Sequence, residues 1–235
     1  MSRIAIIPAR GGSKRIPRKN LRPFHGKPII AYSIDVARRS RLFDRIVVST
    51  DDDEIADLAV SLGADVPFRR PDELANDFAT TLAVIQHAIN SVAEQGTKAD
   101  YVCCLYATAP MLAAESLQEA AAQLEQRPDK SYVFSVTHFD FPVQRALKLG
   151  ADGAVDALYP QYRDTRSQDL EPAFHDAGQF YIGRTAAWLR GDPIMSPCSL
   201  PYKLPRHRVQ DIDTPDDWRR AELLYAALQQ LGEIA

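Results

Sequence analysis

Short apolar runs alternate with segments of helical periodicity along most of the chain. The runs are rich in β-branched residues, as in Ile4-Ala5-Ile6-Ile7, and each ends in a polar or glycine-containing turn, which is typical of buried strands. The expected strands are 3–8, 45–49, 65–68, 101–105 and 132–137. Apolar residues spaced three and four apart predict helices at about 28–40, 53–62, 80–95, 114–126 and 215–231. This alternation predicts an α/β fold: a mostly parallel sheet with helices on both faces.

The alternation stops between residues 138 and 176, where aromatic residues and prolines are spread through turn-rich sequence. Irregular, aromatic-rich insertions of this length are often functional loops or interaction surfaces. Strand-like sequence returns at 178–183. We therefore expect a single domain over residues 1–235, with 138–176 as an insertion within it.

The composition is that of an ordinary globular protein, with 46% hydrophobic and 25% charged residues. A net charge of −3 argues against a general nucleic-acid binder, which needs a basic surplus for its phosphate contacts. No apolar stretch approaches the length of a membrane span, and the N-terminus lacks the apolar core of a signal peptide. The three cysteines form no framework. The sequence predicts a cytoplasmic protein with no membrane or nucleic-acid partner.

The first strand leads into a glycine turn crowded with cations, Pro-Ala-Arg-Gly-Gly-Ser-Lys-Arg-Ile-Pro-Arg-Lys-Asn from Pro8 to Asn20. The two glycines permit a tight turn that presents backbone N–H groups, and the arginines and lysines supply positive charge. Cations this close repel one another unless they share an anion, so the loop predicts a polyphosphate site. A solvated basic loop is the alternative. Neither a Walker A spacing nor a Gly-x-Gly-x-x-Gly fingerprint is present.

A second cluster, Asp211-Ile212-Asp213, precedes the last helix. Alternate residues of an extended segment point the same way, so both carboxylates can face one site. Two convergent oxygen ligands suit Mg²⁺, which also binds phosphate oxygens. Helix capping is the alternative, but Thr214 is the expected N-cap and leaves the two aspartates unexplained. We therefore expect Asp211 and Asp213 to hold Mg²⁺.

The glycine turn resembles the nucleotide-binding signature of the CMP-sugar synthetases, the cytidylyltransferases that activate sialic-acid-like nonulosonic acids. The match runs from Ile7 to Lys14 and continues at Pro17, Lys19 and Asn20. A second matching stretch, Arg-Pro-x-x-Leu-x-x-Asp-x-Ala-x-Thr, occupies 70–81, and Asp-Ile-Asp-Thr-Pro at 211–215 resembles the metal motif of the family. The resemblance implies a Rossmann-like nucleotide-diphospho-sugar transferase fold and a reaction between CTP and a sugar.

By this resemblance, Arg10, Lys14 and Lys19 bind the triphosphate and form the catalytic set together with Asp211. The nucleotide-binding residues that it implies are Ala9, Arg10, Gly11, Gly12, Ser13, Asn20, Arg70, Ala79 and Thr81. Arg70, Ala79 and Thr81 would contact the cytosine, and Asn20 the ribose or base side. The alternative for Thr80 or Thr81 is that either one merely caps the helix that follows.

Three features depart from the sialic-acid enzymes of this family. Arg15 replaces a glycine, Tyr106 replaces a glutamine, and His175 to Tyr181 replaces a shorter run. Together they resemble the pseudaminic acid cytidylyltransferases. The sugar-binding residues implied are Tyr106, Arg166, Gln179, Phe180 and Tyr181, with Arg166 on the sugar's carboxylate. Strand alternation permits only one of Phe180 and Tyr181 to face the site.

The reaction implied is the transfer of CMP from CTP to the anomeric hydroxyl of pseudaminic acid, which gives CMP-pseudaminic acid and pyrophosphate. An N-acylneuraminate or legionaminate substrate is the alternative within this class. The alternative outside it is a CTP-binding regulatory module without turnover, against which the aspartate pair argues. No residue stands out as the general base, for which Asp211 or a metal-bound oxygen could serve. The resemblance also implies a homodimer in which 138–176 dimerises and reaches toward the partner's sugar site.

Overall fold

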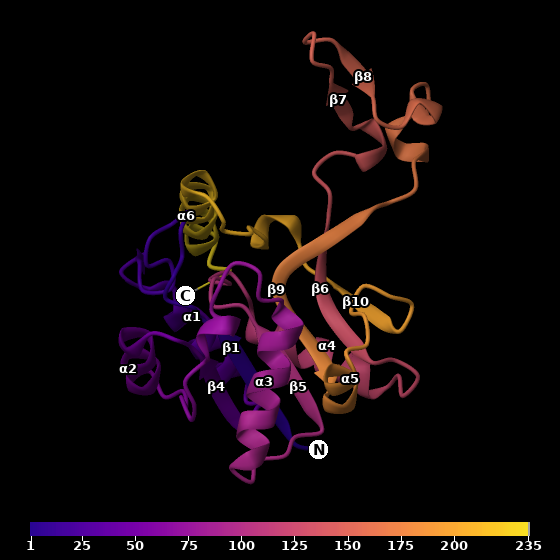
Figure 1. The fold of residues 1–235 in the computed structure, drawn as a ribbon. Coiled ribbons are helices and arrows are strands. Elements are labelled where there is room, and N and C mark those ends of the chain that lie inside the picture. Colours follow the sequence, from indigo (N-terminus) through magenta and orange to yellow (C-terminus); the bar gives the residue numbers. More distant parts are fainter. Residues whose placement is uncertain (235) are drawn as a thin grey trace.

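The computed structural model describes residues 1–234, and six of the strands form one sheet. These strands are β1 (Arg3–Pro8), β4 (Arg45–Ser49), β5 (Tyr101–Leu105), β6 (Tyr132–His138), β9 (Phe174–Arg184) and β10 (Ser199–Lys203). Their order across the sheet is β10-β6-β9-β5-β1-β4 (Figure 1). Strand β9 is antiparallel to β5 and β6, and the other neighbouring pairs are parallel. The prediction of a mostly parallel α/β sheet is confirmed.

Two strand predictions were incomplete. The segment 65–68 is not a strand, because only Asp65 pairs with Val47, in an isolated bridge. Strand β10 was not expected, since Pro201 interrupts its pattern, but β10 lies at the sheet edge, where a missing N–H is tolerated. The remaining strands form two small hairpins: β2 (Pro23–Phe24) with β3 (Lys27–Pro28), and β7 (Leu147–Leu149) with β8 (Val155–Ala157).

Helices cover both faces of the sheet, as predicted. They are α1 (Ile29–Ser40), α2 (Asp53–Ser61), α3 (Thr81–Glu94), α4 (Ala114–Glu125), α5 (Thr185–Arg190) and α6 (Pro215–Gln230), with single 3₁₀ turns at 72–74, 143–145, 160–162, 167–169 and 206–208. Alternate residues of β1 serve opposite cores: Ala5 and Ile7 pack with α1, α2 and α4, whereas Ile4 and Ile6 pack with α3 and α5. None of these helices, over residues 1–234, is long and apolar enough to cross a bilayer.

A third, aromatic cluster fixes α6 against the start of the chain. The ring of Phe24 lies edge to face with the rings of Tyr32, Trp218 and Tyr225, at centroid distances of 5.3–5.6 Å. Ile212, fully buried, belongs to the same cluster. Because this side chain points into the cluster, the residues on either side of it point outward. The cluster therefore sets the orientation of the segment that carries the aspartate pair.

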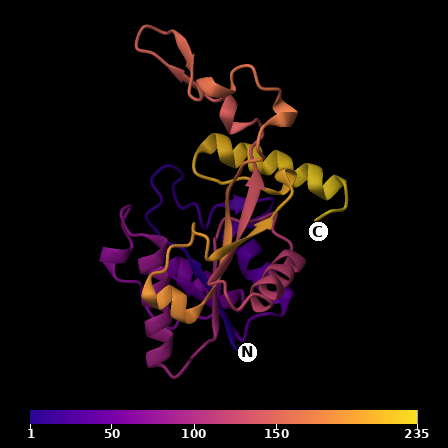
Figure 2. The same cartoon turned by 90° about the vertical axis from the view of Figure 1, so that its right-hand side faces the viewer.

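The segment between β6 and β9 stands away from the sheet. Figures 1 and 2 both show the β7–β8 hairpin and its neighbouring turns as a projection beyond the body of the molecule. Its exposed apolar side chains include Phe141, Leu147, Leu149 and Val155. The predicted insertion at 138–176 lies in this projection, which joins the body through the two adjacent strands β6 and β9.

Candidate active site

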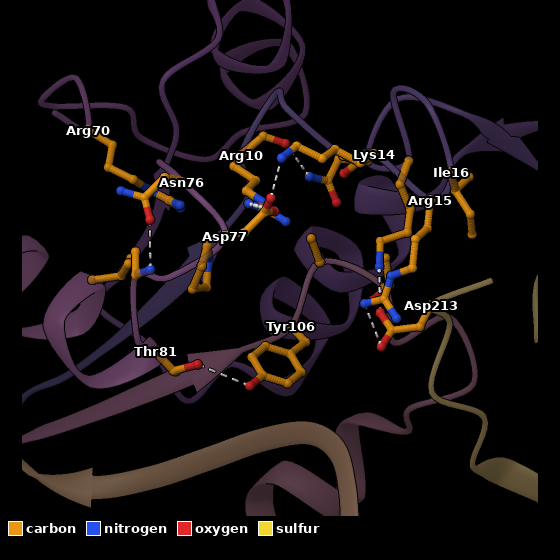
Figure 3. Close-up of a pocket in the computed structure, with 18 of the residues that line it drawn as sticks. Arg10, Lys14, Arg15, Ile16, Arg70, Asn76, Asp77, Thr81, Tyr106 and Asp213 are labelled. Atoms are coloured by element: carbon orange, nitrogen blue, oxygen red, sulfur yellow. Dashed lines mark hydrogen bonds and ion pairs between the residues drawn. The ribbon is translucent and has the colours of Figure 1, made fainter. Parts of the chain in front are cut away.

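A cavity of about 460 Å³ opens beyond the carboxyl ends of β1 and β5 (Figure 3). Four segments line it: the loop after β1, the 70–81 segment before α3, the turn that follows β5, and residues 211–213 before α6. β1 and β5 are parallel neighbours, so their carboxyl ends meet at one edge, where open α/β sheets bind ligands. The motifs that the sequence singled out at separate places thus share one cavity.

The glycine turn is held by the start of α2. The N–H of Gly11 donates to Asp51 Oδ1 at 3.0 Å, and a Cβ on Gly11 would lie 2.6 Å from Asp52 Oδ2, so only glycine fits there. Gly12 has open space around it. Ala9, fully buried, continues the hydrogen bonding of β1. Ala9, Gly11 and Gly12 therefore shape the loop and do not themselves line the cavity.

An aspartate of the 70–81 segment occupies the space between two loop cations. Asp77 pairs with Arg10 at 2.7 Å and with Lys14 at 2.6 Å (Figure 3). Hydrogen bonds from Lys14 and Arg10 hold the pKa of this carboxyl below its usual range. A carboxylate of the chain therefore lies between these two cations, and their binding of a triphosphate stays a prediction. The sequence placed Asp77 in a motif but assigned it no role.

The other loop cations also find carboxylates. Arg15 pairs with Asp213 at 3.0 Å, and Lys19 Nζ lies 3.5 Å from Asp213 and donates to the carbonyl oxygen of Ile212 at 2.6 Å. Lys19 thus ties the loop to the aspartate segment. Arg18 turns away from the cavity to the N-terminus of α2, where it pairs with Asp52.

Two polar residues complete the loop. Asn20 is buried and donates from Nδ2 to the carbonyl oxygen of Arg10 at 2.9 Å, so its amide holds the backbone of a cavity-lining cation. Ser13 lines the cavity directly. A direct contact of Asn20 with a nucleotide stays a prediction.

Arg70 points into the cavity from a buried position. Its side chain donates from Nε to Ser49 Oγ at 3.1 Å and from a second nitrogen to the carbonyl oxygen of Ser49. The residue is only 3% exposed, and burial is the main reason why the pKa of Arg70 falls to about 10. The guanidinium stays charged at neutral pH and is held rigidly by the end of β4. It is therefore a preorganised donor at the cavity wall.

The backbone before α3 is set by two small polar side chains. Asn76 Oδ1 accepts hydrogen bonds from the N–H groups of Phe78 at 2.8 Å and Ala79 at 3.0 Å. Thr80 is the N-cap of α3, since its hydroxyl accepts from Ala83 N at 3.2 Å. The capping alternative therefore applies to Thr80, and Thr81 is left to face the cavity, with its Oγ1 3.2 Å from the Tyr106 hydroxyl.

The two aspartates ahead of α6 both line the cavity, as their spacing predicted. Loss of hydration raises the pKa of Asp211, and repulsion from Asp213 raises it further. Thr214 and Asp217 form a capping box that starts α6 and does not engage either carboxylate of the pair.

The pair has the donor set of a partial magnesium site. Two carboxylates that repel each other across a cavity are suited to share a cation. Residues 1–234 contain no cluster of three or more histidine, cysteine or acidic side chains placed for a metal. A cation on Asp211 and Asp213 would therefore complete its coordination with ligand oxygens and water, as Mg²⁺ commonly does.

The residues expected at the sugar are divided between the cavity, the core and the projection. Tyr106 lines the cavity. Three of the others, Gln179, Phe180 and Tyr181, are buried and do not line the cavity. Phe180 lies in the core with α1 and α4, whereas Tyr181 lies on the opposite face of the sheet, against Tyr106. Arg166 lies on the projection, where it pairs with a nearby aspartate. Direct contacts of all five residues with a sugar stay predictions.

Comparisons with known proteins agree with this architecture. The profile of the family described as Cytidylyltransferase matches residues 4–184. A pseudaminic acid cytidylyltransferase of Campylobacter jejuni is 47% identical over 225 residues, which span 96% of this chain and 97% of that protein. A CMP-N,N'-diacetyllegionaminic acid synthase of Legionella pneumophila is 33% identical over 97% of both chains. The chain belongs to the cytidylyltransferase family.

Solved structures support the fold. The structure of CMP:2-keto-3-deoxy-manno-octonic acid synthetase complexed with CTP has a TM-score of 0.71 at 17% identity and covers 97% of this chain and 99% of its own. A 4-diphosphocytidyl-2C-methyl-D-erythritol synthase has a TM-score of 0.67 at 16% identity, over 95% of this chain and 98% of its own. At such low identity these similarities concern the fold alone.

Proposed function

We propose that this protein transfers CMP from CTP to the anomeric hydroxyl of pseudaminic acid, giving CMP-pseudaminic acid and pyrophosphate. The observation that carries the proposal is the meeting of the cationic loop, the buried Arg70 and the aspartate pair in one cavity. The sugar is chosen because a pseudaminic acid cytidylyltransferase is similar over nearly the whole chain. We place the reaction in the cytoplasm, where CTP is available.

In this reaction the anomeric oxygen forms a bond to the α-phosphorus, and the bond from that phosphorus to the β-phosphate oxygen breaks. Negative charge grows on the departing pyrophosphate. Arg10 and Lys14 line the cavity and share Asp77, and they would neutralise this charge. Asp77 must release them when the triphosphate enters. The proton of the hydroxyl would pass to Asp211, which lines the cavity, through a carboxylate oxygen that is not engaged by a cation.

Mg²⁺ is part of the proposal, with Asp211 and Asp213 as its protein ligands. When bound, Mg²⁺ supplies charge neutralisation at the phosphates. Its binding would displace Arg15 and Lys19 from Asp213 and free these cations for the triphosphate. Asp213→Asn should raise the Mg²⁺ concentration needed for half-maximal turnover, whereas Asp216→Asn, on the exposed first turn of α6, should leave it unchanged. Equal magnesium titrations for the two variants would remove the metal assignment.

A competition experiment decides the sugar. The protein is supplied with CTP, Mg²⁺ and equal amounts of pseudaminic acid, an N,N'-diacetyllegionaminic acid and N-acetylneuraminic acid, and the CMP-sugars are separated and quantified. Tyr106 offers an aromatic surface suited to a deoxy sugar with a methyl group, and it lacks the amide that would satisfy a polyhydroxylated tail. CMP-pseudaminic acid should accumulate first. Preference for either competitor would transfer the assignment to that sugar, and no pyrophosphate release with any of them would favour a non-catalytic CTP sensor.

The proposal includes a homodimer built through the projection. The β7–β8 hairpin exposes Leu147, Leu149 and Val155, at 64%, 78% and 63%, which is a large apolar surface for one small hairpin. Arg166, on the same projection, would then reach the sugar's carboxylate in the partner's cavity. Light scattering after gel filtration should give twice the chain mass for the wild type and the single-chain mass for Leu149→Glu. A wild-type monomer at micromolar concentration would contradict the dimer.

A further inference from the structure

The two aspartates ahead of α6 are held by different kinds of contact. Asp213 pairs with Arg15 and Lys19, two cations of the loop after β1 (Figure 3). The carboxylate of Asp211 forms no ion pair within residues 1–234. The position of Asp211 therefore depends on the backbone that carries it.

That backbone has no strand or helix to support it. The chain leaves the sheet at Leu204, whose N–H donates to the carbonyl oxygen of Val136 at 2.8 Å and whose carbonyl oxygen accepts from Thr137 Oγ1 at 3.0 Å. After the 3₁₀ turn at 206–208, residues 209–213 belong to no regular element before α6 begins. Their backbone groups must therefore find partners elsewhere.

Side chains hold three carbonyl oxygens between residues 208 and 212. The hydrogen bonds run from Gln179 Nε2 to Arg208 at 2.8 Å, from Gln210 Nε2 to Asp211 at 2.7 Å, and from Lys19 Nζ to Ile212 at 2.6 Å. Gln179 is the buried donor, only 4% exposed, whereas Gln210 and Lys19 are partly exposed. Side-chain donors thus take the place that a neighbouring strand would have in a sheet.

A bulge in β9 brings Gln179 to this segment. The step of two residues from Phe134 to Val136 on β6 matches a step of five residues on β9. Gly178, within the bulge, has a φ of +61°, and a Cβ on it would lie 3.7 Å from Asp211 Oδ1. The bulge therefore lies beside the carboxylate of Asp211 and also supplies the donor that holds the backbone before it.

The amide of Gln179 is presented by a fixed backbone. Its N–H donates to Ser135 Oγ at 3.3 Å, and its carbonyl oxygen accepts from the N–H of Tyr106 at 2.9 Å. The side-chain Oε1 is buried and has no hydrogen-bond partner in the described part of the chain. Because an orphaned buried oxygen is destabilising, packing alone would favour an apolar side chain of the same size. What glutamine adds is the donor to the carbonyl oxygen of Arg208.

We propose that Gln179 is a positioning residue that orients Asp211 toward a divalent cation through the backbone of residues 208–211, with Gln210 as a second support. This inference rests on the proposed use of Mg²⁺ by the aspartate pair. Mg²⁺ requires near-ideal octahedral geometry, so its two carboxylate ligands must keep their relative position. Since Asp213 is held separately by the loop cations, a shift of the 208–211 backbone would move one ligand away from the other.

The test measures metal affinity without turnover. Gln179→Met keeps the length of the side chain and removes its donor. Mn²⁺, which takes the same oxygen ligands as Mg²⁺, is titrated into nucleotide-free protein, and the free ion is measured by electron paramagnetic resonance. The dissociation constant of Mn²⁺ should rise about tenfold in this variant.

A second measurement separates positioning from damage to the fold. The affinity for CTP is measured by calorimetry in EDTA for the wild type and for Gln179→Met. It should be the same in both, because the loop cations and Arg70 have no contact with Gln179. A merely structural role would weaken the binding of Mn²⁺ and of CTP together, and that result would overturn the proposal.

The control is Gln86→Met, which also removes an amide donor from a backbone carbonyl oxygen, that of Trp188 at 2.9 Å, but outside the cavity. It should leave the Mn²⁺ affinity unchanged. An Mn²⁺ affinity of Gln179→Met equal to that of the wild type would overturn the proposal. If Gln179→Met does not fold, Gln210→Ala decides: a higher Mn²⁺ dissociation constant supports the proposal, and an unchanged one overturns it.

The metal titration also distinguishes this inference from the proposed function. A wild type that binds no Mn²⁺ would remove the metal assignment and this inference with it, whereas CMP transfer is tested separately by pyrophosphate release. A protein whose Mn²⁺ affinity depends on Gln179 but which releases no pyrophosphate would refute the proposed reaction and leave this inference standing.

Discussion

Adding one methyl group at Gly11 should destabilise the protein far more than adding the same group at Gly12. An ideal Cβ on Gly11 would lie 2.6 Å from Asp52 Oδ2 and 2.9 Å from its Cβ, whereas a Cβ on Gly12 would meet nothing within 4 Å. Asp52 cannot yield freely, because its Oδ1 accepts from Ile55 N at 3.0 Å as the N-cap of α2. Gly11→Ala must therefore displace either the cap or the loop.

The magnitude follows from these two contacts. Loss of an aspartate N-cap costs about 1 kcal/mol of unfolding free energy, and forcing a methyl group into a packed contact costs about 1–3 kcal/mol. The sum is about 2–4 kcal/mol for Gly11→Ala, against less than about 0.5 kcal/mol for a surface change such as Gly12→Ala. In a chain of this size, each kcal/mol lowers the melting temperature by about 2–4 °C.

The assay is paired thermal and urea unfolding of the wild type and both variants, with CTP affinity measured by calorimetry on the same samples. Gly11→Ala should lower the melting temperature by about 4–16 °C and weaken CTP binding, because the displaced loop carries Arg10 and Lys14. Gly12→Ala should behave as the wild type in unfolding. Equal melting temperatures for the two variants would show that Gly11 does not pack against Asp52 at the start of α2.

Three further outcomes follow from the site and its supports. Asp211→Asn should raise the melting temperature in EDTA at neutral pH, because the raised pKa of Asp211 means that its ionised form destabilises the fold. This gain in melting temperature should vanish as the pH falls below the ordinary pKa range of an aspartate, where the wild-type side chain is protonated. Mg²⁺ should raise the melting temperature of the wild type only. Asp77→Ala should tighten CTP binding severalfold by calorimetry, since it frees two loop cations, and an effect no larger than that of Asp72→Ala on the same segment would argue against this competition. Thr214→Ala should lower the urea-measured unfolding free energy by about 1 kcal/mol, and a negligible loss would show that the capping box contributes little.

Several features of the site could be predicted from the sequence because neighbouring residues encode them. The strand and glycine turn around Gly11, the helix start at Thr214, and the outward direction of Asp211 and Asp213 all depend on local periodicity and capping. Ile212 is apolar between two acids, and this alone predicts which way each side chain turns. Local patterns of this kind survive in any fold that buries the apolar positions.

Other features depend on which distant segments meet, and the sequence carries no local signal for that. Asp77 pairs with the cations of the first loop only because the 70–81 segment folds over the end of β1. Tyr181 reaches Tyr106 because β9 enters the sheet antiparallel beside β5, with a bulge that also returns Asp176. Alternation along a strand tells which residues share a face, but register and bulges decide which partners they meet. The chemical groups of the site could therefore be predicted from the sequence, but which of them contact each other was decided by the packing of the whole sheet.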